Sequence, residues 1–473
     1  MPRTRLILLL GALALLAACD NATPEAPSLD AQLREAVTAA AEGAGLDAFR
    51  VPDDGDLAAI PQDPRNPLTP EKVALGRLLM HETALAVNPT HAMMEGTYSC
   101  ASCHHVAAGF RAGVPQGLAD GGVGFGHFGE RRRPHPDYAH DELDRQPIRS
   151  PSLMNGAYQA VTLWNGQFGA AGPNAGTEAE WTEGTPIVNN RLGYEGLETQ
   201  AIAALTVHRM QDGPAFVIET LPEYAARFAA AFPDFRATDP AIASAEMEMA
   251  GLAIAAWERT VLPSEAPFQR WLRGETDAMT AAQKRGAILF FGRAGCVSCH
   301  GGPALANMSF HALGMGELTG PGVFSDFNPK DPVHLGRGGF TQRDADTYRF
   351  KVPQLYNLAD DAFLGHGATF ASIRDVVAYK NAAVPQSTLV PADRLDPLFV
   401  PLGLTEDEVD DLAMFLERGL YDARLGRHVP EALPSGSCFP NNDPQSRIDL
   451  GCEDGMARPR ALEGVGQTRF RGR

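Results

Sequence analysis

The sequence lacks the features that mark several large classes of protein. It has no surplus of positive charge, because 58 Asp and Glu against 40 Lys and Arg in 473 residues give a formal charge of −18. Nucleic acid binding needs the opposite balance, so partners with basic patches are the better expectation. The hydrophobic share of 44% is typical of a globular chain and argues against a disordered or collagen-like protein. Cysteine is scarce, but the seven that occur are informatively spaced.

Long apolar runs are also missing, apart from a short one near the start. Residues 6–16 are apolar, but a membrane-spanning helix takes about 20 residues. Arg3 and Arg5 precede this run and Cys19 follows it, a pattern that resembles a bacterial lipoprotein signal. We predict that residues 1–18 are a signal peptide and that Cys19 carries a lipid. The mature protein would then lie in the periplasm, anchored to a bacterial membrane only by that lipid. An ordinary secretory signal is the alternative and also predicts export.

Four other cysteines form two copies of one motif. Cys100-Ala-Ser-Cys103-His104 and Cys296-Val-Ser-Cys299-His300 both read C-x-x-C-H, the pattern that attaches c-type haem. The two thiols form thioethers with the porphyrin, and the adjacent histidine is held so that one ring nitrogen reaches the iron. Two copies in an exported chain predict two covalently bound haem c groups.

Other uses of these cysteines are less consistent with the pattern. A zinc site usually combines C-x-x-C pairs into four ligands, and a thiol redox pair needs no histidine after it. The last two cysteines, Cys438 and Cys452, lie in a polar segment rich in Gly, Pro and Asn. We predict that they form a structural disulfide, as expected in an oxidising compartment. This bond would staple the C-terminal tail, residues 426–473, and have no chemical role.

Local patterns predict helices separated by loops. Thr69-Pro70 provides an N-cap and a first-turn proline, and Asp239-Pro240 is expected to open a helix that runs to about residue 262. Capping boxes at residues 280–283 and 405–408 predict two more helices in the second half. No segment sustains the alternating pattern of a strand. The sequence therefore predicts an all-α fold with long loops.

A series of further segments resembles the bacterial di-haem cytochrome c peroxidase and MauG family. The resembling segments are residues 66–79, 99–104, 151–155, 163–166, 197–201, 256–260, 268–274, 286–300, 350–353, 355–357 and 366–367. The resemblance implies two cytochrome-c-like domains, each around one covalent haem. We place them at residues 63–265 and 266–425, after a tether and N-terminal segment at residues 19–62.

The resemblance also implies roles for single residues. The N-terminal haem, with His104 as proximal ligand, is where peroxide reacts, and the C-terminal haem, with His300, stores or delivers an electron. Trp164 occupies the slot of the family's tryptophan between the haems and would relay charge, although a buried core tryptophan is the alternative. Gln200 matches a glutamine beside the peroxidatic haem, and His366 matches a histidine near the second haem.

The peroxidatic pocket departs from the family at its proton-transfer residue. The family's glutamate falls on Met210, or on Arg209 if one residue is deleted, and neither is a useful base. We predict that His208 moves the proton instead, because histidine titrates near neutral pH. The alternatives are weak peroxide chemistry, ligation of the iron by His208 or Met210, or a plain solvent-facing helix. His127 falls near the family's loop histidine that caps the resting iron and is a candidate ligand, with a solvated loop histidine as the alternative.

Two more sets of positions are altered. The second haem's distal ligand falls on Lys380, with Tyr379 and Met315 as alternatives, or with Lys380 as a plain surface lysine. A lysine amine ligates iron only where burial or the metal lowers its pKa. The family's bridging calcium would meet Arg149 and Asp361. Because calcium needs oxygen ligands, the guanidinium argues against calcium, and we predict an ion pair in its place.

Together these observations predict a periplasmic di-haem c-type oxidoreductase that reduces hydrogen peroxide with electrons from a small redox protein, such as a cytochrome c or a cupredoxin. Two alternatives stay open: MauG-like oxidation of a side chain on a co-encoded partner protein, and a di-haem electron carrier without catalysis. The Gly- and Pro-rich stretches at residues 109–147 and 166–191 are either a docking surface for the partner or solvated insertions.

Overall fold

The computed structural model describes residues 27–452 and residue 466. Its helices are α1 (Leu29–Ala40), α2 (Pro70–His81), α3 (Gly196–Val207), α4 (Gly213–Thr220), α5 (Pro222–Ala231), α6 (Ala245–Arg259), α7 (Pro267–Leu272), α8 (Ala281–Phe291), α9 (Arg337–Thr341), α10 (Ile373–Ala382), α11 (Glu406–Met414) and α12 (Pro444–Leu450). The strands β1 (Gly122–Val123), β2 (Arg133–Pro134), β3 (Phe310–His311) and β4 (Phe350–Lys351) pair antiparallel as β1 with β2 and β3 with β4. The predicted helix-rich fold is confirmed.

The predicted signal peptide and Cys19 lie outside the described residues. Within residues 27–452, no helix combines the length and the apolar character needed to cross a bilayer.

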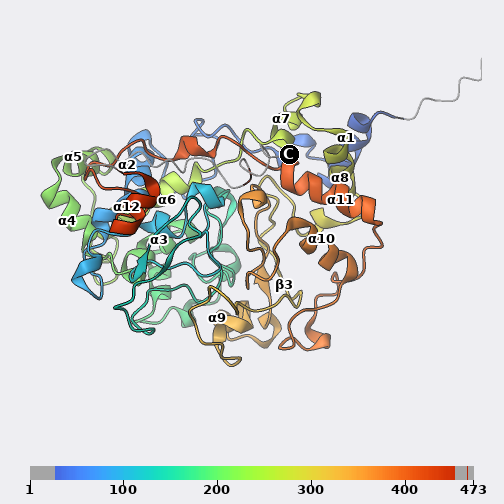
Figure 1. The fold of residues 1–473 in the computed structure, drawn as a ribbon. Helices are drawn as coiled ribbons and strands as arrows, with labels where there is room; N and C mark the ends of the chain where they lie inside the picture. Colours follow the sequence, from blue (N-terminus) through green and yellow to red (C-terminus); the bar gives the residue numbers. More distant parts are fainter. Residues whose placement is uncertain (1–26, 453–465, 467–473) are drawn as a thin grey trace, which may run out of the picture.

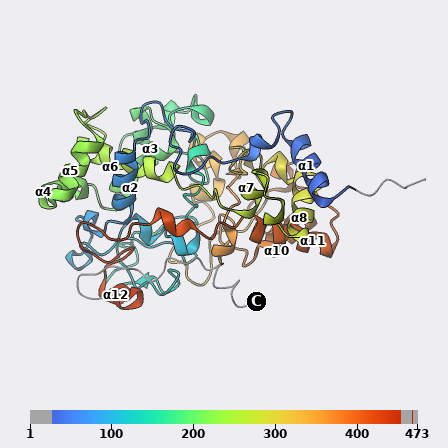
Figure 2. The same ribbon diagram turned by 90° about the horizontal axis from the view of Figure 1, so that it is seen from above.

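The helices gather into two groups that lie side by side (Figures 1 and 2). Helices α2 to α6 and α12 form one group, which contains the first C-x-x-C-H motif, and α1, α7, α8, α10 and α11 form the other, which contains the second motif. The predicted boundary between residues 265 and 266 falls in the loop that joins α6 to α7. The division into two cytochrome-c-like domains stays a prediction.

The first group is built on the crossing of α2 and α6. Helix α2 begins as predicted at Pro70, where the Thr69 side chain accepts a hydrogen bond from a first-turn amide. Helix α6 begins later than predicted, at Ala245, because Ser244 caps it and accepts a hydrogen bond from the Met247 amide at 3.2 Å. The helices approach so closely that a Cβ on Gly76 would overlap the backbone of Ala253 in α6.

The second group has the same kind of close helix crossing, between α8 and α11. Both helices begin at the predicted capping boxes, Thr280 with Gln283 and Thr405 with Glu408. A Cβ on Gly286 in α8 would overlap the backbone carbonyl of Asp411 in α11. Each group therefore has a glycine where these two helices cross, and the C-x-x-C-H segment follows the first helix of each pair.

The N-terminal segment belongs to the second group, which the sequence does not predict. Helix α1 packs against α8, and its Asp30 carboxylate accepts hydrogen bonds from Lys284 and from the Trp271 indole, both at 2.8 Å. Residues 29–40, which belong to the predicted tether and N-terminal segment at residues 19–62, thus form a packed helix.

The two long loops are largely folded against the body of the protein. In residues 109–147, β1 and β2 pair and side chains such as Phe125 and Arg132 are buried. In residues 166–191, Trp181 is buried, and its indole N–H donates to Thr177 at 3.1 Å. Trp181 therefore does not offer an exposed ring to a partner.

The C-terminal tail returns from the second group to the first. Its Cys438 and Cys452 are bonded to each other, with 6.0 Å between their Cα atoms, and the bonded loop contains α12. Helix α12 lies at the lower edge of the first group, apart from α4 and α5 (Figure 2).

Candidate functional site

The second C-x-x-C-H motif opens onto a large cavity. Cys296–Ser298 form one 3₁₀ turn directly after α8, and Gly295 takes a left-handed conformation, φ +65°, to make that turn. Cys296, Cys299 and His300 line a cavity of about 460 Å³. This is within the usual range for sites that bind small molecules or cofactors.

His300 is prepared as an iron ligand. Its Nδ1 lies 2.9 Å from the Leu305 carbonyl oxygen, which can only accept, so Nδ1 carries the proton and Nε2 is free. Burial lowers the pKa of His300 to about 4, which keeps the ring neutral. Two thiols, a neutral imidazole and a cavity of this volume fit a covalently bound haem.

Of the three predicted distal ligands of the second haem, two line this cavity and one does not. Lys380 and Met315 line it, whereas Tyr379 does not line it, and its hydroxyl donates to the Leu313 carbonyl. Burial lowers the pKa of Lys380 to about 8, and its Nζ lies 5.6 Å from the ring of Phe399. Lys380 is therefore a half-buried amine at the cavity wall, not a plain surface lysine.

The first C-x-x-C-H motif is more enclosed. Cys100–Ser102 again form a 3₁₀ turn, and Cys100, Cys103 and His104 line a cavity of about 50 Å³. His104 repeats the pattern of His300: its Nδ1 lies 3.3 Å from the Phe110 carbonyl oxygen, and burial lowers its pKa to about 4. The donor set fits haem as it does at the second motif, but lining side chains must move to admit a porphyrin into this smaller space.

Helix α3 supplies the wall of the first cavity that the family resemblance marks as catalytic. Gln200, Ala204 and His208 are four residues apart on one face of the chain and all line this cavity. His208 Nδ1 lies 2.9 Å from Asp144 Oδ2. Burial by itself lowers the pKa of His208, but the Asp144 carboxylate outweighs burial and the net shift is upward.

The other candidates at this site are placed differently. Met210 lines the first cavity, whereas Arg209 turns away to an ion pair with Asp120 and to the Glu142 carbonyl. His127 is exposed, lines neither cavity, and is therefore not positioned as an iron ligand here.

Sequence reasoning missed one acid in the first cavity. Glu258, on α6, lines the same cavity as Gln200, and burial raises its pKa to about 8, so that it is protonated at neutral pH. A signal for it was present, because Glu258 lies one helical turn after the apolar Ile254, which also lines the cavity. The sequence does not show that α6 turns this face toward the first motif.

Trp164 and Arg149 lie between the two motifs. Trp164 lines the larger cavity, and its indole N–H donates to the Arg149 carbonyl at 2.7 Å. The chain continues from Arg149 to Pro151, whose carbonyl lies within hydrogen-bonding reach of His104. Trp164 is half-buried at a cavity wall, not a plain core residue. The ring of His366 packs against Trp164, with 6.1 Å between the ring centroids.

The predicted ion pair between Arg149 and Asp361 is present. The guanidinium of Arg149 lies 2.6 Å from Asp361 and donates to the carbonyls of Ala112, Val114 and Phe363. Both residues are buried. In the part of the chain that the structure describes, no three His, Cys, Asp or Glu side chains gather as a metal site. That the pair replaces a bridging cation stays a prediction.

Comparisons with known proteins agree with this arrangement. The family model for di-haem cytochrome c peroxidase matches residues 70–277. Cytochrome-c peroxidase IdrP1 of Denitromonas iodatirespirans is 29% identical over 405 residues, covering 81% of this chain and 90% of that protein. Methylamine utilization protein MauG of Methylorubrum extorquens is 28% identical over 375 residues, covering 78% and 82%. A crystal structure described as a MauG-like protein associated with microbial copper homeostasis has a TM-score of 0.53 and 24% identity, covers 79% of this chain and 95% of that chain, and supports the fold.

Proposed function

Because this chain is a relative of the di-haem cytochrome c peroxidases and of MauG, as its sequence predicted, we propose that it binds two haem c groups and reduces hydrogen peroxide at the first motif. One observation carries the proposal. Both C-x-x-C-H segments present a neutral histidine whose Nδ1 is held by a carbonyl, so that Nε2 is left for a metal. When bound, haem supplies the redox-active iron that the side chains lack.

His208 is the group that we assign to proton transfer. Asp144 holds its Nδ1–H, which leaves Nε2 to take a proton from hydrogen peroxide and to return it to the leaving oxygen. Asp144 also stabilises the positive charge that His208 gains in this exchange. Two electrons and two protons convert one hydrogen peroxide to two water molecules. Gln200 offers an amide from the same helix face to orient the peroxide.

At the second motif, we assign the electron-transfer role to the site of His300. Lys380 is the distal ligand that we favour, because its half-buried amine lines the cavity and makes no ion pair within residues 27–452. Trp164 relays charge toward the first motif along its hydrogen bond to Arg149. The direct test is Lys380→Met, which would change the absorption and EPR spectra of the second haem. Unchanged spectra would favour Met315.

The electron donor and the alternative activity are separable by experiment. We propose a cytochrome c or a cupredoxin as donor. The MauG relative makes oxidation of a partner protein the second candidate. Purified holoprotein is mixed with peroxide and a reduced cytochrome, or with a co-encoded protein. Steady cytochrome oxidation supports the peroxidase, and a mass change in the co-encoded protein supports the alternative. Two low-spin haems that are inert to peroxide would leave only an electron carrier.

We also propose that the protein is exported and lipidated at Cys19. The bonded pair Cys438 and Cys452 suits an oxidising compartment such as the periplasm. Cell fractionation and the mass of the mature N-terminus test this proposal, with Cys19→Ala as the variant. Finding unprocessed, cytoplasmic protein would refute it.

A further inference from the structure

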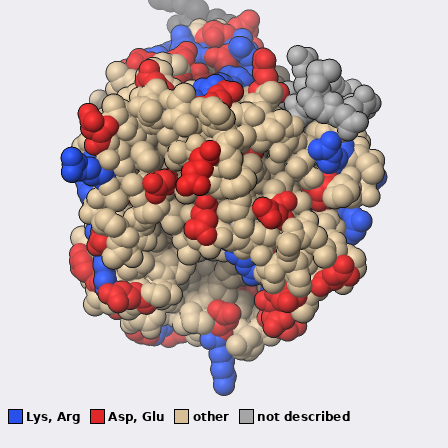
Figure 3. All heavy atoms as spheres, turned by 90° about the vertical axis from the view of Figure 1, so that its left-hand side faces the viewer, with Lys and Arg blue, Asp and Glu red and all other residues tan. Residues whose placement is uncertain are grey.

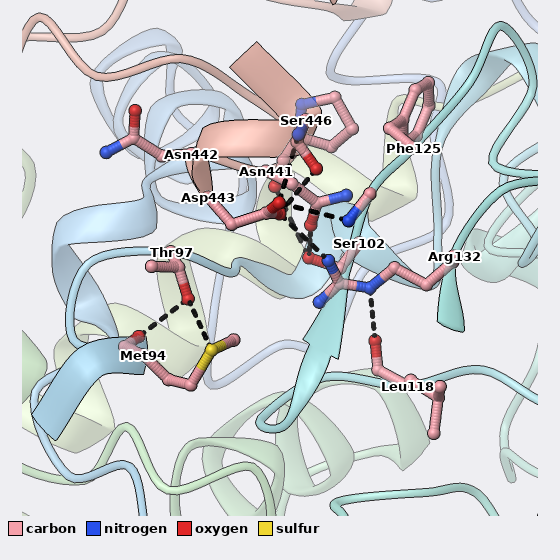
Figure 4. Close-up of polar contacts among 12 residues, drawn as sticks. Met94, Thr97, Ser102, Leu118, Phe125, Arg132, Asn441, Asn442, Asp443 and Ser446 are labelled. Atoms are coloured by element: carbon pink, nitrogen blue, oxygen red, sulfur yellow. Dashed lines mark hydrogen bonds and ion pairs between the residues drawn. The ribbon is translucent and has the colours of Figure 1, made fainter. Parts of the chain in front are cut away.

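The disulfide-bonded tail covers the first C-x-x-C-H motif. The Ser99 hydroxyl donates to the Pro440 carbonyl at 2.8 Å, and the Asn442 amide N–H donates to the Thr97 carbonyl, also at 2.8 Å. The Asn442 side chain adds a bond to the Gly96 carbonyl at 3.1 Å. Figure 4 shows the tail residues Asn441 and Asp443 beside Ser102 and Arg132. Residues 440 and 442 of the tail thus bind the short segment 96–99 that directly precedes Cys100.

Asn441 reaches into the motif itself. Its side-chain oxygen accepts a hydrogen bond from the hydroxyl of Ser102, the residue immediately before Cys103 (Figure 4). Ser102 also accepts from the Ser99 amide at 3.0 Å, so the turn between the two attachment cysteines is tied on both sides. Asn441 and Ser102 are buried. The turn that sets the position of His104 is therefore fixed partly by the tail.

The second motif has no such contact. Ser298 occupies the place that Ser102 has in the first motif, but it is exposed, and its hydroxyl makes no hydrogen bond within residues 27–452. The molecule thus contains its own internal control for the effect of the tail.

The tail also places a negative charge beside the first motif. Asp443 lies 3.4 Å from Arg132, and both side chains are only 2% exposed. Arg132 donates to the carbonyls of Leu118 and Ala119 at 3.0 and 2.9 Å, and Ala119 lines the first cavity. A buried charge needs a partner, and Asp443 is the carboxylate that pairs with Arg132. The segment that Arg132 holds also lies against the motif, because a Cβ on Gly117, the neighbour of Leu118, would lie 2.8 Å from Cys103 Sγ.

We propose that the disulfide-bonded tail is a working part of the first haem site, in which Asn441 positions the turn between the attachment cysteines and Asp443 compensates the charge of Arg132 beside Cys103. These are positioning residues, because they act through Ser102 and Arg132. The inference rests on the proposed function, since it requires haem at Cys100 and Cys103.

The charge part is tested by Asp443→Asn in the purified holoprotein. Removing the carboxylate leaves the positive charge of Arg132 uncompensated, which favours the reduced state of a nearby iron. A spectroelectrochemical titration is expected to show a higher midpoint potential for the first haem and an unchanged one for the second. The matched control is Glu431→Gln, which removes the same charge from an exposed position in the tail. An equal shift in both variants, or none in Asp443→Asn, overturns the inference.

The positioning part is tested by Ser102→Ala, a small change that keeps the test available if Asp443→Asn does not fold. We expect altered EPR g-values for the first haem only, while Ser298→Ala leaves both haems unaltered. Wild-type spectra in Ser102→Ala overturn this part. Mass spectrometry of the wild-type protein distinguishes failure of the proposed function from failure of this inference. Absence of haem at Cys100 and Cys103 refutes the proposed function. An attached haem whose potential and spectra do not change in these variants refutes only the inference about the tail.

Discussion

The two C-x-x-C-H motifs have the same local chemistry but different surroundings. In the first, Ala101, Ser102 and Cys103 are buried and the tail lies over them, whereas no residue of the Cys296–Ser298 turn is buried. The first cavity is small and the second is large, and titratable side chains line both: His208 and Glu258 the first, and Glu317, His366 and Lys380 among others the second. A closed site with proton-transfer groups suits peroxide chemistry, and an open site suits electron exchange with a partner. The difference between the sites therefore lies in what surrounds each motif.

The largest expected effect is loss of one haem at a time. The double variant Cys100→Ser with Cys103→Ser should lose covalent haem at the first site, keep the second haem, and lose the reaction with peroxide. The double variant Cys296→Ser with Cys299→Ser should keep one haem that still reacts with peroxide but no longer turns over with a donor. Intact-protein mass and stopped-flow absorption measure both outcomes. Equal behaviour of the two double variants would contradict the assignment of the peroxide reaction to the first haem and of electron delivery to the second.

The next effect concerns the buried ion pair that links the two helical groups. Arg149→Met leaves the Asp361 carboxylate with only the more distant Arg111 at 3.4 Å. We expect a loss of about 3 kcal/mol in the free energy of unfolding, since a buried charge without its partner is costly. Urea denaturation measures it. The matched control is Arg285→Met, whose pair with Asp411 is partly exposed and worth at most about 1 kcal/mol. A similar loss in both variants would contradict the prediction.

Opening the tail should also affect the first site more than the second. Replacing Cys438 and Cys452 with serine removes a cross-link over 14 positions, which is worth about 3 kcal/mol in the chain-entropy model. The melting temperature should fall, and the tail should be cleaved earlier by protease. Dithiothreitol should reproduce the loss in the wild type and have no further effect on the variant. If dithiothreitol does not lower the melting temperature of the wild type, the prediction is wrong.

The two helix crossings should respond alike. Gly76→Ala and Gly286→Ala each place a Cβ against a backbone carbonyl that cannot move freely. Overpacking of this kind costs about 1 to 3 kcal/mol. Gly55→Ala, in a turn with ordinary contact distances, should change stability by less than about 0.5 kcal/mol. If only one crossing is sensitive, the two helical groups are not equivalent in their packing.

The smallest effect is a shift in pH dependence at the first site. Asp144 raises the pKa of His208, so Asp144→Asn should lower that pKa. The unprotonated form, which acts as base, would then persist to lower pH, and the acidic limb of kcat/KM for peroxide should move to lower pH. His208→Gln should remove this limb altogether. A limb that stays in place in both variants would point to another group, with Glu258 the first to examine.

Helix starts show how much of the fold can be predicted locally. Pro70, the capping box at Thr280 and the one at Thr405 each act within four residues, and all three helices begin where predicted. The start of α6 was predicted too early because Asp239-Pro240 and Ser244 are competing local signals, and packing of the helix on α2 selects the second. The packing of α1 on α8 could not be predicted, because the two segments are more than 200 residues apart.

The sequence by itself was enough to find the two C-x-x-C-H motifs, to predict the pairing of Cys438 with Cys452, and to mark Trp164, Gln200 and His208 through a family resemblance. These signals are local in sequence, because a motif or a cap needs only neighbouring residues. Tertiary structure alone decided which distant polar groups meet, such as His208 with Asp144, Glu258 with the first cavity, and Asp443 with Arg132. The reason is physical. Burial and the charge of the partner set the pKa of each group and the free energy of burying it, and both depend on how the helices pack.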